Sequence, residues 1–398
     1  MLLLLLTGCS LAPVYTDPDT GELVANAARI SLLKKSSVKT IYSTSTNVFY
    51  LMNNASVLAS GCNDKGLLGQ GNTNAYDYVV QVKLSERIKL ISANDSFAAA
   101  VSDTNNIYIW GDLSWWDSDT ITVTGENFAY RKFSFEEIIT DISVSENHIA
   151  VLSKKGNVYT LGYNYGQLGY DCTAYNQGQL YNEFRRVETD QFISKIGTNP
   201  TATYMISSNG QLFGCSFNTF YELGYMDTIL DVNQIQANTA FTALTTAGHN
   251  LFALSSAGDV YVCGQNSYGV LGLNSTLASA AALTRIPFGK DIKIKNIYGC
   301  DYNNTVFFIS EDNDIYACGA NSDNSLLTED TGSAVLAPSK VKIGKVSAFY
   351  GMGTTRFYID ASDHLYTYGD NSYGQMPITT SSGNSKFVSP VRIYANVK

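Results

Sequence analysis

The chain has 398 residues, with 35 Asp or Glu against 26 Lys or Arg, a formal net charge of −9 and a pI of about 4.9. A nucleic-acid partner requires a basic footprint that displaces counterions from phosphates, so this balance argues against nucleic-acid binding. The 27 Tyr and 18 Phe, against only 3 Trp, favour instead a binding surface built from amphipathic aromatic side chains.

The N-terminus carries a short apolar run that ends near a cysteine. Residues 2–6 are all Leu, and the LTGC tetrapeptide ending at Cys9 has the form of a bacterial lipobox. The run is much shorter than the about 20 residues that span a bilayer. We therefore expect residues 1–8 to be a shortened lipoprotein signal peptide, with lipid on Cys9 and a flexible tether over residues 9–26. The alternative is an incidental apolar N-terminus with an unmodified cysteine.

From about residue 27 onward, one register recurs seven times. Aliphatic residues stand ten and four positions before each anchor, an apolar residue that is Tyr or Phe in six units stands three before, and Asn stands two after in six of the seven units. A period near 51 residues indicates a repeat architecture. The anchors are Gly61, Gly111, Gly162, Ser216, Gly264, Gly319 and Gly369.

Each unit reads as four short strands. β-Branched and aromatic segments such as 251–255 and 260–264 flank a four-residue turn that contains Gly, as hairpins require. A strand is predicted before each hairpin, at 88–93, 139–144, 241–245 and 294–298, and another after it, at 79–84, 341–343 and 391–394. No stretch keeps a helical period. Residues 27–398 are therefore predicted to form one all-β domain, a seven-bladed β-propeller with four-stranded blades.

The two ends of this domain bear on how the ring closes. Residues 28–32 are similar in pattern to residues 390–394. We expect one of these segments to complete a blade that is begun at the other end of the chain.

Two segments carry a family resemblance. The sequence GQNSYGVLG over residues 264–272 and GCNDKGLLG over residues 61–69 resemble the signature of the regulator of chromosome condensation repeat family, here in a bacterial lipoprotein form. The resemblance covers roughly residues 27–398 and implies a seven-bladed propeller. The resemblance also implies exchange-factor activity on a small GTPase. The acidic balance and the divergent second and fourth units argue against that activity in this chain.

The residues that usually carry chemistry are few. Without Cys9, six cysteines remain; Cys263 and Cys318 fall in a strand-interior position of the repeat, so buried thiols are predicted there. No C-x-x-C, Cys/His cluster or nucleophile motif is present, and we predict no metal, no cofactor and no catalytic residue. His148, at a position where the resembled family often has His, is expected to brace a neighbouring loop.

Aromatic residues follow most anchors. Loops that leave successive blades on one face form a broad platform, and interface hot spots favour Trp and Tyr. For Tyr268 and Tyr373 the alternative is packing against the next blade. The predicted binding residues are Trp115, Trp116, Tyr165, Tyr175, Phe220, Tyr221, Tyr268 and Tyr373.

Three functions are compatible with these observations. The leading hypothesis is a monomeric, non-catalytic binding module, held in the bacterial cell envelope by lipid on Cys9, that binds a protein or a surface glycan. A propeller enzyme acting on glycans is the second, and three carboxylates at the mouth of the central channel would favour it. The third is a scaffold in an outer-membrane assembly complex, which co-purification with such a complex would favour.

Overall fold

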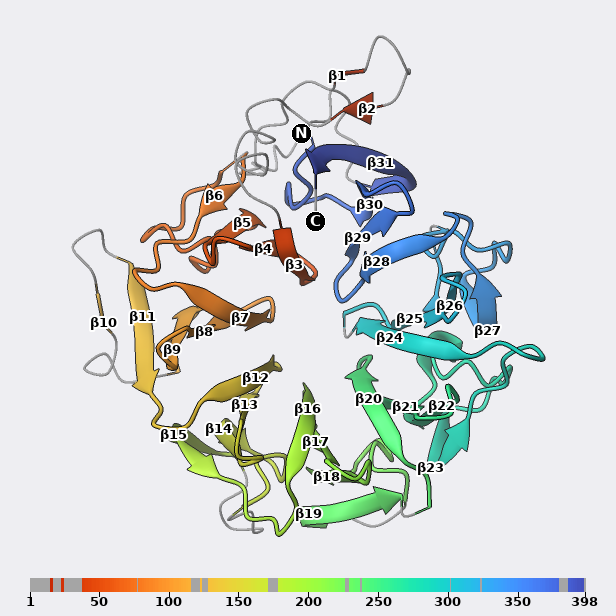
Figure 1. The fold of residues 1–398 in the computed structure, drawn as a ribbon, viewed down its shortest axis with the longest axis horizontal. Helices are drawn as coiled ribbons and strands as arrows, with labels where there is room; N and C mark the ends of the chain where they lie inside the picture. The colour runs from red at the N-terminus through yellow and green to blue at the C-terminus, as the bar shows by residue number, and fades with distance from the viewer. Residues whose placement is uncertain are drawn as a thin grey trace, which may run out of the picture.

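A computed structural model describes residues 15–16, 23–24, 38–76, 78–115, 122–123, 128–170, 178–225, 229–236, 238–300, 302–322, 324–378 and 386–396. Seven four-stranded antiparallel blades are arranged in a ring around a central opening (Figure 1), which confirms the predicted seven-bladed β-propeller. A two-residue strand β10 (Thr122–Val123) extends the second blade, and β1 (Tyr15–Thr16) pairs with β2 (Leu23–Val24) near the N-terminus.

Within each blade the strands follow chain order from the ring centre outward. Blades 1 to 3 are formed by β3 (Val38–Ser43), β4 (Asn47–Met52), β5 (Val57–Gly61) and β6 (Val80–Gln81); β7 (Ile88–Ala93), β8 (Phe97–Ser102), β9 (Asn106–Gly111) and β11 (Ala129–Ser134); and β12 (Ile139–Val144), β13 (His148–Ser153), β14 (Val158–Asn164) and β15 (Gln179–Arg186). Blades 4 and 5 are formed by β16 (Ile193–Asn199), β17 (Ala202–Ser207), β18 (Leu212–Ser216) and β19 (Ile229–Gln236); and β20 (Phe241–Thr246), β21 (Asn250–Ser255), β22 (Val260–Gln265) and β23 (Ser279–Arg285). Blades 6 and 7 are formed by β24 (Ile294–Cys300), β25 (Thr305–Ser310), β26 (Ile315–Ala320) and β27 (Ala334–Lys340); and β28 (Val346–Tyr350), β29 (Thr355–Asp360), β30 (His364–Asp370) and β31 (Lys386–Asn396).

The predicted strands match well at the hairpins and less well at the blade edges. β7 and β12 have the predicted bounds, and β20 and β24 extend slightly further. The outermost strand of blade 6 was predicted at 341–343, which is wrong: β27 ends at Lys340, and Val341 only forms an isolated bridge with Thr328. An edge strand pairs on one side only, so the alternation of apolar and polar residues that predicts a strand is weaker there. One short 3-10 turn, Ser267–Gly269, is the helical element among the described residues.

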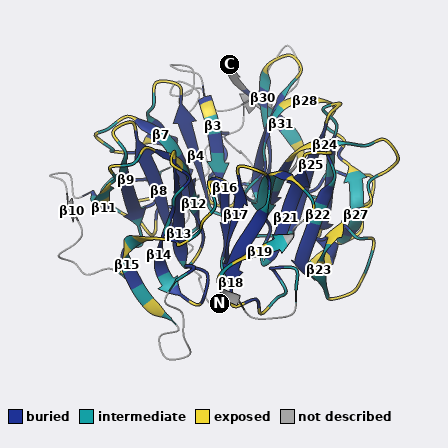
Figure 2. Cartoon of the chain, turned by 60° about the horizontal axis from the view of Figure 1, so that its bottom comes forward, coloured by how far each residue is buried: buried dark blue, intermediate teal, exposed yellow. Residues whose placement is uncertain are grey.

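The hydrophobic core lies between neighbouring blades (Figure 2). All residues of the two aliphatic positions of the repeat are buried. One cluster joins Phe49 of blade 1 to Tyr108 of blade 2, and another joins Tyr50 of blade 1 to Phe357 of blade 7. A single blade therefore cannot bury its own faces, and the ring is stabilised by contact between neighbours.

Blades 1 and 7 meet where the ring closes. The described strands of each blade come from one end of the chain, and residues 390–394 lie in β31 of blade 7. Residues 28–32 lie outside the described residues, so their part in completing a blade stays a prediction. Hydrogen bonds join the two blades: the Gly353 amide donates to Ser43 Oγ at 2.9 Å, and Ser60 Oγ donates to the Gln375 carbonyl at 2.6 Å. These side-chain contacts span 310 residues or more, and the Thr354 amide also donates to the Thr44 carbonyl at 3.3 Å, so both kinds of bond join the two blades.

The anchor glycines have a steric explanation. Gly61, like the anchors of blades 2, 3, 5, 6 and 7, has a positive φ, here 116°, and a Cβ at this position would lie 2.2 Å from the Thr46 carbonyl oxygen. Only Gly combines that backbone conformation with so close an approach. Ser216, the exception in blade 4, is outside the positive-φ region, and its buried hydroxyl donates to Glu222 at 2.6 Å.

The repeated Asn, present in six of the seven blades, forms hydrogen bonds with the loop that follows the anchor. Asn266 Nδ2 donates to the carbonyls of Ser275 and Leu277, both at 2.9 Å, and its Oδ1 accepts from the Leu271 amide at 3.1 Å. The corresponding Asn residues of blades 1 and 6 make the same three bonds. The backbone N–H and C=O groups of a loop without regular structure need hydrogen-bond partners. One Asn side chain supplies partners for two carbonyls and one amide.

The side chain one position before the anchor links several blades to the preceding one. Cys263 and Cys318 are fully buried thiols, as predicted, and each lies 3.3 Å from a carbonyl oxygen in the preceding blade. Cys215 makes the same contact at 3.3 Å, and Trp110 donates its indole N–H at this position at 2.9 Å. Burial raises the pKa of the Cys215 thiol to about 12, so it stays protonated as a donor.

Candidate binding face

The loops after the anchors share one end of the ring with the turns between the first and second strands. The Cys62 amide donates to the Thr46 carbonyl at 3.1 Å, and the equivalent bond joins Tyr163 to Asn147 at 2.9 Å. We call this end the loop face. In an antiparallel blade the first and third connections must lie at the same end, so the whole ring presents these loops together.

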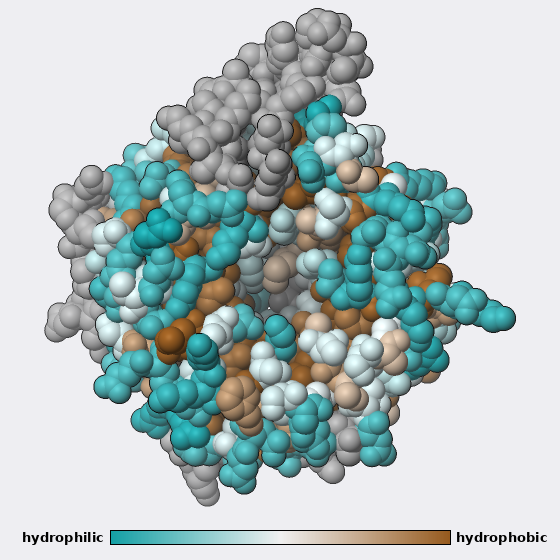
Figure 3. All heavy atoms as spheres, in the orientation of Figure 1, coloured by the Kyte–Doolittle hydropathy of each residue, from teal (hydrophilic) through white to brown (hydrophobic). Residues whose placement is uncertain are grey.

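A central cavity of about 270 Å³ opens among the innermost strands and the turns of the loop face. Figure 3 shows one face of the ring, with hydrophilic residues over most of the rim and hydrophobic residues gathered around a central hollow. Ser43, Ser92, Ser143 and Thr198 contribute hydroxyl groups to the cavity lining. The lining therefore combines these hydroxyl groups with apolar side chains such as Ile91, Ile142 and Leu244.

Two carboxylates are among the described lining residues, Asp141 and Glu146. Asp141 lies at a β-bulge between β12 and β13, where its carboxylate accepts from the Ile142 amide at 2.9 Å. Burial is the main influence on Asp141 and raises its pKa to about 6, against hydrogen bonding and the nearby Lys195. The trio of carboxylates that would favour a glycan-cleaving enzyme does not occur among the described lining residues.

Three of the predicted binding residues are exposed on the loop face. Tyr165, Tyr268 and Tyr373 are 42%, 61% and 43% exposed, so their rings are available to a partner rather than packed under the next blade. Two more exposed apolar side chains, Phe217 and Leu277, lie in the same loops of blades 4 and 5. Leu277 is not aromatic and was missed by the sequence reasoning, since exposure of a loop residue leaves no pattern in the sequence.

Tyr165, Phe217, Tyr268 and Leu277 lie on three consecutive blades, and we call them the exposed arc. Large exposed apolar side chains that gather on one face commonly mark interaction sites. Tyr268 has a positive φ of 57° in the turn of blade 5, a conformation that is uncommon for a residue with a side chain. The loop therefore holds the most exposed ring of the arc in an unusual backbone conformation.

Other predicted residues pack within the ring. Trp115 stacks on Tyr163 at 5.8 Å between ring centroids, and its indole donates to the Asp112 carbonyl at 3.1 Å. Phe220 stacks on His249 at 4.1 Å, which joins blade 4 to blade 5. These two rings therefore contribute to packing between blades.

Of the remaining predicted residues, the structure describes only Tyr221. Tyr221 is half-buried, with a positive φ of 61° in its turn. Trp116, Tyr175 and Cys9 lie outside the described residues.

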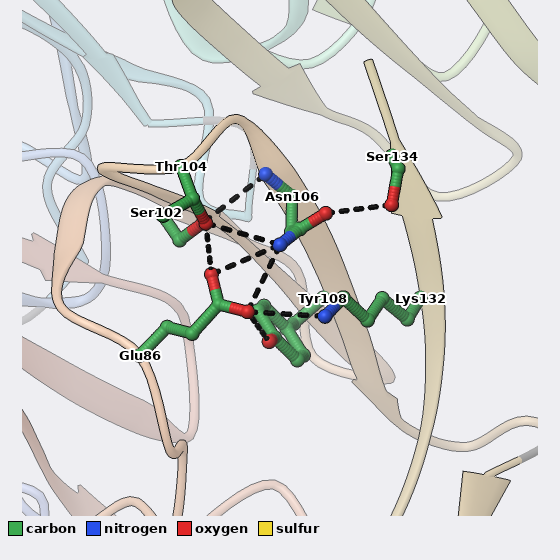
Figure 4. A network of polar contacts seen from close by, with 7 residues as sticks. All are labelled: Glu86, Ser102, Thr104, Asn106, Tyr108, Lys132 and Ser134. Carbon is green, nitrogen blue, oxygen red and sulfur yellow. Dashed lines mark hydrogen bonds and ion pairs between the residues drawn. The ribbon is translucent and has the colours of Figure 1, made fainter.

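A polar network at the opposite end of the ring joins blades 1 and 2 (Figure 4). Glu86 accepts from Tyr108 at 2.6 Å, from Asn106 at 2.9 Å and from Lys132 at 3.0 Å, and it also contacts Thr104. Partial burial opposes ionisation, but these hydrogen bonds outweigh it and hold the pKa of Glu86 well below its usual range.

The same arrangement recurs in blade 3, which indicates a structural role. Glu137 stands 51 residues after Glu86 and accepts from Asn157 at 3.0 Å and from Lys155 at 3.3 Å. A carboxylate that braces a hairpin turn in consecutive repeats belongs to the scaffold. We therefore place no catalytic function on the network of Figure 4.

The part of the chain that the structure describes contains no group of three His, Cys, Asp or Glu residues arranged to hold a metal ion. Nor does this part contain a helix of the length and apolarity needed to cross a membrane.

The seven blades, the repeated Asn loops and the interblade bonds define a repeat propeller that presents its loops on one face. The sequence comparisons make the likeness more specific: the chain is similar to proteins named regulator of chromosome condensation. Regulator of chromosome condensation from Mus musculus is 23% identical over 319 residues, which cover 72% of this chain and 73% of the relative. Ultraviolet-B receptor UVR8 from Arabidopsis thaliana is 23% identical over 291 residues, covering 70% of this chain and 64% of the receptor.

Three further comparisons show how far the likeness extends. The human regulator of chromosome condensation is 24% identical over 251 residues, and the match spans 56% of this chain and only 59% of the relative's own length. Among solved structures, Prp20p from Saccharomyces cerevisiae is 14% identical with a TM-score of 0.68, covering 92% of this chain and 89% of that one. Human WBSCR16 is 16% identical with the same TM-score, covering 80% and 85%. No protein-family model matches the chain.

Proposed function

We propose that this protein is a non-catalytic binding module that binds a protein partner through the exposed arc. The observation that carries the proposal is the set of large apolar side chains exposed on consecutive blades beside the central cavity. The Prp20p structure is described together with binding to Gsp1p and histones, which supports a protein partner for this chain also. A surface glycan is the second class of ligand, because aromatic rings and small polar groups also suit sugars.

Replacing two rings of the arc is expected to remove binding. A Tyr165→Ser/Tyr268→Ser double variant of the full chain should lose about 100-fold in affinity, since each hot-spot ring contributes about 1–2 kcal/mol. The measurement is affinity capture from a native envelope extract, followed by titration of the captured partner.

The control for this experiment comes from the opposite end of the ring. Phe192 and Ile138 are 53% and 50% exposed in connections that lead into first strands. A Phe192→Ser/Ile138→Ser variant changes surface hydrophobicity by a similar amount and should capture the partner unchanged. If both double variants capture it as well as the unaltered chain does, the arc is not the binding site.

We further propose that the protein is held in a bacterial cell envelope by lipid on Cys9. The support is the LTGC tetrapeptide, in which small residues precede the cysteine. Expressed with its native leader, the protein should incorporate labelled fatty acid and stay with the membrane fraction, because the acyl chains bury many methylenes at about 0.8 kcal/mol each. Cys9→Ser should incorporate no label and release the protein. Label retained in that variant would contradict the proposal.

A further inference from the structure

Arg356 interrupts an otherwise uncharged position of the repeat. It lies on β29, thirteen residues before its anchor, and its side chain is only 1% exposed. A guanidinium remains charged at all relevant pH values, so a full positive charge is buried at the junction of blades 6 and 7. The corresponding residues of the other six blades are Val48, Ala98, Ile149, Thr203, Leu251 and Val306, all buried.

The described surroundings of Arg356 contain no anion partner. Its Nη1 donates to the Thr354 carbonyl at 3.1 Å, and its Nη2 lies 3.4 Å from Thr305 Oγ1. The guanidinium carbon is 5.1 Å from the centre of the Phe307 ring. No described carboxylate lies within ion-pair distance, and Nε has no hydrogen-bond partner among the described residues. Cation–π contact alone compensates only part of the cost of burying a charge.

A second buried arginine in the same ring provides the comparison. Arg131 is 4% exposed and lies over the Phe133 ring at 4.8 Å, much as Arg356 lies over Phe307. Arg131 Nη2, however, pairs with Glu183 at 3.3 Å. Of these two arginines over aromatic rings, one has its carboxylate within the described chain and the other does not.

Arg356 lines a cavity of about 170 Å³ on the loop face, between blades 6 and 7. The lining also includes Lys386, Ser322, Ser325 and Asp370. Asp370 Oδ1 already accepts from the amide and the hydroxyl of its neighbour two residues on. Among the described lining residues, two cations and one carboxylate sum to a formal charge of +1, and the size of the cavity suits a group of a few heavy atoms.

We propose that this cavity binds a carboxylate group. The planar guanidinium fork matches the two oxygens of a carboxylate, and Ser322 and Ser325 supply further hydroxyl donors. A monoanion neutralises the formal charge of the cavity, whereas a phosphate dianion would leave an excess of negative charge. Lys386 adds a second positive charge to the lining.

Acetate is the first probe, added to the full-length protein at constant ionic strength with chloride as the reference. Acetate at about 100 mM should raise the Tm by about 3 °C if its Kd is near 1 mM. The Nε–H signal of Arg356 in an arginine-labelled NMR spectrum should shift with the same saturation curve. Arg356→Lys keeps the charge but lacks the fork, and it should bind acetate at least tenfold more weakly.

Arg356→Val restores the residue type found in blades 1 and 6 and should fold. It should show no response to acetate, while Arg131→Val should keep the response of the unaltered protein. Equal acetate responses in Arg356→Val and the unaltered chain would overturn the proposal, and so would the absence of a saturable response in the unaltered chain and in both the Asp301→Asn and Asp323→Asn variants. Tighter binding of inorganic phosphate than of acetate would overturn the choice of a carboxylate.

Two further comparisons separate the possible sources of the carboxylate. Asp301 stands two residues before the lining residue Asn303, and Asp323 follows Ser322, but both lie outside the described residues. If Asp301→Asn or Asp323→Asn destabilises the chain and opens the site to acetate, the carboxylate is the chain's own and no external ligand is bound. If Arg356→Val loses the captured partner, the carboxylate belongs to that partner. If it keeps the partner but loses acetate, the ligand is a free small acid, and this result stands even if the exposed arc has no binding function.

Discussion

Substituting Gly61 by Ala is expected to lower the free energy of unfolding by about 4 kcal/mol. The added Cβ would lie 2.2 Å from the Thr46 carbonyl oxygen and 2.9 Å from the Asn47 Cα, both backbone atoms, at a φ of 116°. Neither neighbour can move without breaking the pairing of β4 with β5, so strain and lost hydrogen bonds add together. Equilibrium unfolding in urea measures the change.

Gly66, five residues along the same loop, is the matched control. It also has a positive φ, 73°, but a Cβ there would meet only the Asn72 carbonyl at 3.9 Å. Gly66→Ala should therefore cost only about 1 kcal/mol, the penalty of the left-handed conformation alone. Similar losses for the two variants would show that conformation, and not the close approach of two strands, explains the repeated anchor glycine.

Replacing His148 should change how stability depends on pH. The ring is fully buried, with Nδ1 2.8 Å from Ser145 Oγ and Nε2 2.8 Å from Thr203 Oγ1 of the next blade, which bears out its expected role in bracing a neighbouring loop. Burial lowers the pKa of His148 to about 3 from an ordinary 6.5. The neutral ring therefore stabilises the fold fully above pH 6.5, and this contribution is lost as the pH falls from 6.5 towards 3.

The expected slope is about 1.4 kcal/mol per pH unit between these two values. Asp141 acts in the opposite direction, because its raised pKa of about 6 lets the folded state bind a proton between pH 6 and 3.8. His148→Asn removes the titrating group and keeps a residue type found at this position in blades 1 and 5. Asp141 titrates in both proteins, so its effect cancels when the two are compared. In urea unfolding between pH 3.5 and 7, the difference in the free energy of unfolding between the unaltered chain and the variant should show the slope expected for His148. Parallel curves would contradict this role of His148.

The exposed arc and the Arg356 cavity lie on the loop face but on different blades. The arc is apolar and spans blades 3 to 5, whereas the cavity is charged and lies between blades 6 and 7. A partner protein that covers the loop face could reach both. The variants proposed for the two sites do not overlap, so each site can be tested while the other is intact.

The candidate site was predicted only in part. Sequence position correctly indicated that Tyr165, Tyr268 and Tyr373 belong to surface loops, because they follow the repeated Asn turn. It could not distinguish these exposed rings from Trp115, which stacks on Tyr163 of the next blade. Whether a loop ring is exposed depends on residues about 50 positions away, and no local pattern records that distance.

The sequence by itself determined the architecture of this protein. Alternation of apolar residues defines the strands, Gly and Asn define the turns and loops, and a period near 51 makes each blade the neighbour of a similar one. These signals are local and repeated seven times, so single exceptions such as Ser216 do not obscure them. Only the tertiary structure decided how blades 1 and 7 meet, which aromatic rings are exposed, and that Arg356 is buried beside a cavity. Those features arise where side chains of different blades meet, and contacts between distant residues depend on the assembled ring.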